Sequence, residues 1–168
     1  MRELNREVLE ELYRAHYNAA MLYTLSLCRD RDAAEDIVAA AFETALLTLS
    51  DENQNFRAWL LMACRSRWID ETRRRARRKW TPLEETAAAV PDNALETLLR
   101  TERHLALYRA IERLSGRDRE LVTLHYFAGL PVAEAARMLG VSPAAAKTAL
   151  FRARGKLRRW MEEDGHAL

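Results

Sequence analysis

The chain has 168 residues and a formal net charge of +2; 49% of its residues are hydrophobic, 31% are charged, and glycine and proline are scarce. This composition excludes collagen-like and low-complexity proteins, and so many hydrophobic side chains exclude an intrinsically disordered chain. The longest uninterrupted apolar run, Ala58–Cys64, is much shorter than the ~20 residues that a membrane-spanning helix needs. Acidic residues stand near the start, where a signal peptide has its apolar segment, so we expect a cytoplasmic protein with no membrane insertion.

The small net charge conceals two strongly basic segments. Residues 57–80 carry nine arginines and lysines against two acidic residues, and residues 143–160 carry six against none. Because concentrated positive charge attracts polyanions at long range, this pattern indicates contacts with nucleic acid at two separate places.

Apolar residues recur at spacings of three and four along every long segment, and no alternating run of β-branched residues is present. This periodicity predicts an all-α protein. We expect a first helix that ends near Cys28, a turn and N-cap at residues 30–32, and a second helix that reaches Leu49. The polar residues 50–55 favour a loop, and a third helix is expected from residue 56 to about residue 80.

The sequence changes in character after the third helix. Pro82 and Pro91 bracket a segment rich in glutamate and alanine, and each proline disfavours helix at the residue before it. We therefore expect two small helical domains, over residues 1–80 and 95–168, joined by a flexible linker over residues 81–94. Helices in the second domain are expected over residues 95–114, 118–127, 132–139 and 143–161, with an interruption at Gly116 and a helix end at Gly129.

The connection between the last two helices is the most specific local signal. Gly140 suits a left-handed C-terminal cap, and Val141 can lie buried between two helices. Ser142 can cap the next helix, whose first residue is Pro143, where the missing N–H costs nothing. These residues predict a helix-turn-helix. The inward face of its second helix is expected to consist of Ala146, Leu150, Ala153 and Leu157.

The opposite surface of this last helix is small, polar and basic. It consists of Ala144, Lys147, Thr148, Phe151, Arg152 and Arg154. Such a surface can enter the major groove of duplex DNA, while Arg158 and Arg159 contact phosphates. The alternative is an ordinary helical hairpin with a solvated basic face.

The other basic segment contains tryptophans among its arginines. Trp59, Trp68 and Trp80 alternate with arginine clusters on one expected helix. Cations that follow a backbone beside aromatic platforms for unstacked bases are typical of single-strand recognition. The alternative is that the tryptophans pack in the core and the arginines are merely solvated. We expect Trp59 in the core, leave Trp68 open between the two, and expect Trp80 to anchor the linker.

Nothing in the sequence favours catalysis. The four histidines are too scattered for a metal-ligand pair, no glycine-rich phosphate loop is present, and Cys28 and Cys64 are expected to be reduced thiols that pack as small hydrophobic residues. Glu35 and Asp36 lack a second carboxylate at a spacing that suggests acid–base chemistry. We therefore expect no enzyme activity, no cofactor and no bound metal.

Several motifs resemble a known family. Residues 32–38 (DAAEDIV) with Phe42, residues 56–60 (FRAWL), Ile69-Asp70 and the arginine run resemble region two of a group IV, extracytoplasmic-function (ECF) type bacterial RNA polymerase sigma factor of the sigma-70 family. Residues 114–121, 126–136, 139–142 and 147–157 resemble region four of the same family. The resemblance covers nearly the whole chain in order and implies a promoter-specificity subunit that directs transcription initiation.

The resemblance also implies roles for individual residues. One helix would dock on the β′ clamp helices of core polymerase. The residues on or under it would be Asp36, Ile37, Val38 and Phe42. The melted −10 strand of promoter DNA would be held by the loop at Asp51, Asn53 and Asn55 and by Ser66, Arg67, Asp70, Arg73, Arg74 and Arg77. The duplex −35 element would be contacted by Lys147, Thr148, Phe151, Arg152, Arg154 and Arg158, while region four packs on the β flap. An anti-sigma factor is the expected regulator.

The chain departs from the family pattern at four places. Ala39-Ala40 replaces a usual Gln-Glu, which bears on core binding, and Leu46 replaces a usual Trp. Ser66 replaces Asn and Ala149 replaces Arg, which bears on promoter sequence. One other function remains open: a sigma mimic or sequestered interaction protein that binds an anti-sigma factor without directing initiation. A stand-alone dimeric helix-turn-helix activator would leave the whole first domain unexplained.

Overall fold

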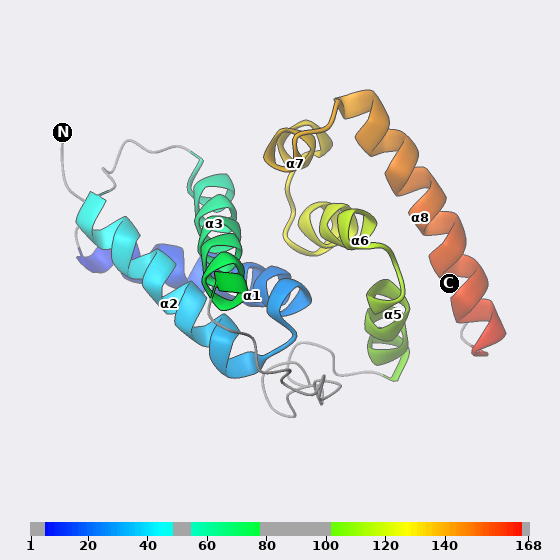
Figure 1. Cartoon of the computed structure of the whole chain (residues 1–168), viewed down its shortest axis with the longest axis horizontal. Coiled ribbons are helices and arrows are strands. Elements are labelled where there is room, and N and C mark those ends of the chain that lie inside the picture. The colour runs from blue at the N-terminus through cyan, green and yellow to red at the C-terminus, as the bar shows by residue number, and fades with distance from the viewer. Residues whose placement is uncertain (1–5, 49–54, 78–101, 166–168) are drawn as a thin grey trace. The chain divides into compact units, whose positions relative to one another are not determined.

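The computed structural model describes residues 6–48, 55–77 and 102–165, and every regular element in these ranges is a helix (Figure 1). The all-α prediction is therefore confirmed. The chain divides into two compact units, of which the first ends at Pro91 and the second begins at Asp92. The expected linker over residues 81–94 lies outside the described residues. None of the described helices is both long enough and apolar enough to cross a membrane.

The first unit contains three long helices that pack on one another: α1 (Arg6–Cys28), α2 (Arg31–Thr48) and α3 (Phe56–Arg77). The turn between α1 and α2 follows the sequence prediction. The Asp30 carboxylate accepts hydrogen bonds from the backbone N–H groups of Asp32, at 3.0 Å, and Ala33, at 3.4 Å. It thereby satisfies two of the N–H groups that the start of α2 leaves without a helical partner.

The core of this unit is formed where the apolar faces of the three helices meet. Leu25, Val38 and Leu60 are almost completely buried, one from each helix. The Phe42 ring lies 4.9 Å from that of Tyr13 and 5.9 Å from that of Phe56, so aromatic contacts join all three helices. Cys64 is fully buried, and burial raises the pKa of its thiol to about 11. Such a thiol stays protonated and behaves as a small hydrophobic side chain, as expected.

The second unit contains α5 (Glu102–Glu112), α6 (Gly116–Val122), the π-helix η1 (Thr123–Phe127), α7 (Val132–Leu139) and α8 (Pro143–Glu163). The prediction that Gly116 interrupts the helices is wrong in detail, because Gly116 is the first residue of α6. The interruption lies at Ser115, whose extended backbone ends the preceding turn and whose Oγ accepts from the Asp118 N–H at 3.4 Å. Arg119 completes this corner by donating to the carbonyl oxygens of Glu112 and Leu114, each at 3.1 Å.

The helix expected over residues 118–127 consists of two different elements. After Val122 the chain changes to π-helical hydrogen bonding, in which the Ala128 N–H donates to the Thr123 carbonyl at 2.9 Å. Hydrophobic spacing cannot reveal this change over a single turn, since α- and π-helical periods differ too little there. Gly129 then adopts a φ of 73°, which ends the helix where the sequence predicted.

The caps in the connection between α7 and α8 have the predicted geometry, whereas Val141, expected to be buried, is half-buried. Gly140 is left-handed, with φ 69° and ψ 30°, and the Val141 N–H donates to the Ala136 carbonyl at 3.0 Å. The Ser142 Oγ accepts from the Ala145 N–H at 3.1 Å, and Pro143 opens α8. The inward residues of α8 are buried against α5, α6 and α7, as expected: Ala146, Leu150, Ala153 and Leu157, with Met161 one turn further.

Replacing Gly140 with alanine should destabilise the second unit by about 1 kcal/mol. A Cβ at Gly140 would meet no atom within 4 Å, so the cost arises from the left-handed backbone alone. Gly155 serves as the matched control, since its Cβ would also meet nothing and it lies inside α8 without a positive φ. There the same substitution should stabilise by about 0.5–1 kcal/mol. Urea unfolding of both variants measures the change in the free energy of unfolding, which should be negative for Gly140→Ala and positive for Gly155→Ala. Equal changes at the two positions would show that the left-handed backbone of Gly140 is not the cause.

Candidate nucleic-acid and protein interfaces

The outer face of α8 carries the six residues that the sequence predicted for duplex DNA. All six are exposed, and Phe151 retains 70% of its accessible surface although it is a large apolar side chain. Thr148 donates its hydroxyl hydrogen to the Ala144 carbonyl at 3.1 Å, which leaves its oxygen as an acceptor on the surface. The structure therefore brings together on one helix face Lys147, Thr148, Phe151, Arg152, Arg154 and Arg158.

The cations of α8 are not neutralised by nearby acids. Among the described residues, no carboxylate lies within ion-pair distance of Lys147, Arg152, Arg154 or Arg158. Arg159 is exposed as well. The full positive charge of this face is therefore available to a phosphate backbone.

Two of these arginines also border an apolar groove of about 430 Å³. Arg154 and Arg158 lie at its edge, and its apolar lining comes from α5, α6, η1 and α8: Leu107, Ile111, Val122, Tyr126, Phe127 and Leu157. Tyr126 is 47% exposed there. The sequence placed both arginines on the DNA-facing surface, but it did not indicate a groove beside them.

The second half of α3 carries the other basic surface. Ser66, Arg67 and Asp70 are exposed, as are Arg73, Arg74 and Arg77 on the following turns. Glu71 lies 4.0 Å from Arg74 and 3.8 Å from Arg75, measured between nitrogen and oxygen. No carboxylate of the described residues pairs with Arg67, Arg73 or Arg77. The charges of these three exposed arginines are therefore not offset by a carboxylate, and the exposed ion pairs of Glu71 with Arg74 and Arg75 are weak.

A groove of about 520 Å³ runs between the start of α2 and the second half of α3. It is lined by residues of both charges and two alanines: Asp30, Asp32, Ala33, Asp36, Ile37, Ala40, Arg67, Asp70, Glu71, Arg74 and Arg75. The small side chain of Ala40, one of the departures from the family pattern, forms part of its wall. Of the four residues predicted to bind polymerase, only Asp36 is exposed. Ile37 is buried but lines the groove, and Val38 and Phe42 are buried in the core.

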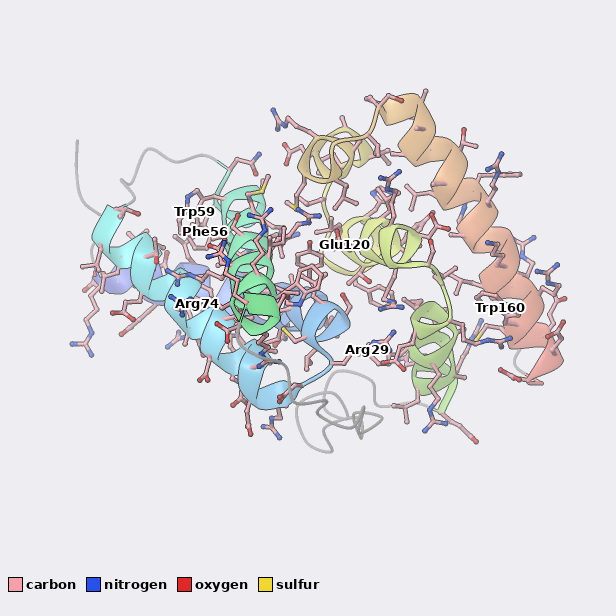
Figure 2. All side chains as sticks on the ribbon, viewed as in Figure 1. Arg29, Phe56, Trp59, Arg74, Glu120 and Trp160 are labelled. Atoms are coloured by element: carbon pink, nitrogen blue, oxygen red, sulfur yellow. The ribbon has the colours of Figure 1, made fainter. Side chains whose placement is uncertain are left out.

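The two tryptophans of α3 that the structure describes, Trp59 and Trp68, do not differ in burial: both are half-buried. Trp59, expected in the core, is only half-buried and stacks on Phe56 with ring centroids 5.9 Å apart (Figure 2). Trp68, which sequence reasoning left open, is also half-buried and lines a small pocket beside Cys28 and Ile37. Neither ring is a fully exposed platform for a base. Trp80 lies outside the described residues.

The expected −10 loop is described only at its end. Asp51 and Asn53 lie outside the described residues. Asn55 is exposed, and its carbonyl accepts a hydrogen bond from the Trp59 N–H at 3.1 Å at the start of α3. The structure therefore anchors Asn55 to the helix that bears the arginines.

Three side-chain pairs were not foreseen from the sequence. The Arg57 Nε–H donates to His16 Nδ1 at 3.1 Å, and Arg67 donates to Thr44. The Arg113 guanidinium lies 4.4 Å from the ring centroid of Trp160 (Figure 2 labels Trp160 on α8). These partners are far apart in the sequence, so no local spacing signals them. Among the described residues, no group of three or more histidine, cysteine or acidic side chains is arranged to hold a metal.

The bond between His16 and Arg57 predicts a pH dependence of stability. Burial, and then the positive charge of Arg57, lower the pKa of His16 below its ordinary value of 6.5. The unfolded chain therefore binds more protons than the folded one below that value. The contribution of neutral His16 to the free energy of unfolding is complete above pH 6.5. It is lost as the pH falls through the lower pKa of His16 in the folded protein.

A His16→Gln variant should show less of this dependence. Between about pH 7.5 and about pH 5.5, the free energy of unfolding should fall further in the wild type than in the variant. Chemical unfolding at both pH values measures the difference. An identical pH dependence in the two proteins would show that His16 is not the group responsible.

Family models match both units. The Sigma-70 region 2 model matches residues 12–78, and the Sigma-70 region 4 model matches residues 104–157. Together they cover α2, α3 and the part of α8 up to Leu157. The order of the two regions is the one that the sequence motifs predicted.

Two relatives of known family are similar to this chain over most of its length. The chain is 37% identical over 134 residues to the ECF RNA polymerase sigma factor SigF of Caulobacter vibrioides, covering 78% of this chain and 73% of SigF. It is 27% identical over 152 residues to the ECF sigma factor SigM of Bacillus subtilis, covering 89% of this chain and 93% of SigM.

Two solved structures have a similar fold. CnrH in complex with the cytosolic domain of CnrY aligns with a TM-score of 0.61 at 25% identity, over 95% of this chain and 91% of CnrH. The sigma factor RpoE of Bartonella quintana, solved with the anti-sigma factor NepR, aligns with a TM-score of 0.65 at 20% identity, over 91% of this chain and 96% of RpoE. The chain therefore belongs to the ECF sigma factors of the sigma-70 family, the non-catalytic subunits that direct promoter recognition by RNA polymerase, and carries their region 2 and region 4 domains.

Proposed function

We propose that α3 and α8 bind one promoter at two places, with α3 on the opened −10 strand and α8 on the duplex −35 element. One observation carries this proposal: each helix presents a row of exposed cations of which most have no carboxylate partner among the described residues. A row of unpaired cations in a protein of nearly zero net charge is suited to a phosphate backbone.

At the −35 element, some side chains of α8 contact bases and others contact phosphates. Arg152 and Thr148 can reach base edges in the major groove, while the exposed ring of Phe151 can contact a thymine methyl group. Lys147, Arg154 and Arg158 neutralise phosphates on either side and fix the register of the helix.

At the −10 element, α3 follows a single strand. Arg67, Arg73, Arg74 and Arg77 provide the phosphate contacts, and Ser66 and Asp70 offer hydrogen-bonding groups between them. Asp51, Asn53 and Asn55 are proposed to hold an unstacked base. Since Trp59 and Trp68 are both half-buried, we assign most of the affinity to charge and little to stacking.

Core polymerase is proposed to bind α2 through the exposed Asp36 and through Ile37, which is buried except where it lines the groove. Val38 and Phe42 are buried and act by supporting the helix from below. The apolar groove edged by Arg154 and Arg158 is the surface that we assign to the β flap. This function requires a cytoplasmic location.

Control by an anti-sigma factor completes the proposal. CnrH, which is similar over nearly the whole chain, is solved as a complex with the cytosolic domain of CnrY. A partner that covers α2 or α8 would compete with polymerase or promoter for the same exposed surfaces. The partner of this chain is therefore expected to bind its region 2 or region 4 domain.

A run-off transcription assay with cognate core polymerase and a promoter library tests the function. We expect transcripts whose templates share two elements, at fixed distances upstream of the start site. One departure favours the alternative of a sigma mimic: Ala39-Ala40 presents two methyl groups on α2 where polar side chains are usual. A chain that directs no initiation and still binds an anti-sigma domain would establish that alternative.

A further inference from the structure

One hydrogen bond joins a proposed DNA-binding arginine to a neighbouring helix. The Arg67 guanidinium on α3 donates to Thr44 Oγ1 on α2. Thr44 in turn donates its hydroxyl hydrogen to the Ala40 carbonyl at 2.9 Å. A hydroxyl has only one hydrogen. Because that hydrogen is committed to the α2 backbone, the lone pairs of the oxygen are left for the guanidinium.

The partner of Arg67 is neutral, which distinguishes this arginine from two of its neighbours. Arg74 and Arg75 both lie near the Glu71 carboxylate, which offsets part of their charge. A guanidinium has five N–H groups, and Thr44 accepts from one nitrogen without cancelling any charge. Arg67 is exposed at the edge of the groove between α2 and α3, so its other donors are accessible from solvent.

We propose that Thr44 is a positioning residue for the −10 strand: it orients the guanidinium of Arg67 for a phosphate without itself touching DNA. This inference rests on the proposed function, in which Arg67 contacts that strand. A free arginine side chain must be ordered when it binds, and that cost opposes affinity. The bond to Thr44 orders the side chain beforehand, since α2 and α3 are held together by the core.

The test uses holoenzyme saturated with core polymerase and a fluorescent single-stranded −10 oligonucleotide taken from the promoter selection. Thr44→Val keeps the shape of the side chain and removes the acceptor, and we expect it to weaken binding about 3- to 10-fold. Thr44→Ser keeps the hydroxyl and should bind as the wild type does. Thr48→Val is the matched control, because Thr48 makes the same kind of bond, to the Thr44 carbonyl at 2.7 Å, and bonds to no arginine of the described residues.

Salt dependence separates positioning from charge. Removal of a phosphate contact by Arg67→Ala should reduce the slope of log K against log salt by about 0.7. Thr44→Val leaves every charge in place, so its slope should remain that of the wild type. In the Arg67→Ala background, Thr44→Val should have no further effect, since the group that it orients is gone.

Three results would overturn the inference. Equal losses from Thr44→Val and Thr48→Val, or an undiminished loss in the Arg67→Ala background, would mean that Thr44 acts only through the stability of α2. Normal binding by Thr44→Val, with Arg67→Ala impaired, would remove this inference and leave the proposed function intact. Normal affinity and slope for Arg67→Ala would remove the −10 assignment of Arg67 and this inference with it.

Discussion

Removal of the three outer arginines of α3 should weaken binding of the holoenzyme to the −10 strand about 100-fold at ~0.1 M salt. The variant combines Arg73→Gln, Arg74→Gln and Arg77→Gln, all at exposed positions. Each phosphate contact to a single strand contributes a salt exponent of about 0.7, or about 5-fold at this salt concentration. The effects multiply, and the slope of log K against log salt should fall by about 2. Fluorescence titration with the −10 oligonucleotide at several salt concentrations measures both quantities.

The matched control removes the same charge elsewhere. Arg6, Arg14 and Arg109 are exposed on α1 and α5, outside the basic row of α3. Replacing them with glutamine should leave the slope nearly unchanged. A comparable loss in the control would mean that net charge alone, and not the placement of arginines on α3, determines affinity for the strand. The −10 assignment of Arg73, Arg74 and Arg77 would then fail.

Replacing Arg152 with alanine should reduce binding to the −35 duplex by roughly 10- to 100-fold and relax the base preference at one position. The side chain is exposed on the outer face of α8, beside Phe151 and Thr148, and has no carboxylate partner among the described residues. A bidentate contact to a base contributes about 1–3 kcal/mol of discrimination against the wrong base. Holoenzyme binding to a set of single-base variants of the selected −35 element measures the preference.

Arg158→Ala provides the contrast, because Arg158 is assigned to a phosphate. It should weaken all duplexes about equally, by roughly 8-fold at ~0.1 M salt, and reduce the salt slope by about 0.9. The base preference should stay that of the wild type. If Arg152→Ala weakened every duplex equally as well, Arg152 would contact the backbone rather than a base. A different residue of α8 would then have to read that position.

Much of the region 4 domain could be predicted because the information is local. The cap at Gly140, the serine at position 142 and the proline at 143 each act through backbone groups within a few residues. The inward face of α8 follows from helical periodicity, which also leaves the cations on the outer face. In the same way, the sequence predicted a turn and N-cap at residues 30–32, and the structure identifies the Asp30 carboxylate as the capping group.

The sequence was a poorer guide to the type of helix and to the degree of burial of individual side chains. The π-helix at Thr123–Phe127 was missed because hydrophobic spacing scarcely differs from that of an α-helix over one turn. Trp59 was expected in the core and is half-buried, because the fraction of a large ring that is covered depends on how the neighbouring helices meet it. Periodicity gives the face of a helix on which a residue lies, and not how deeply that face is covered.

The sequence by itself determined the class of fold, the helix-turn-helix and the two basic segments, since periodicity, capping and charge are properties of neighbouring residues. Only the tertiary structure decided that Val38 and Phe42 lie beneath the surface of α2, and that Thr44 meets Arg67 and His16 meets Arg57. Each of these relations joins residues on different helices, or depends on which face of a helix its neighbours cover. The packing of helices sets such relations, and no local pattern in the sequence encodes them.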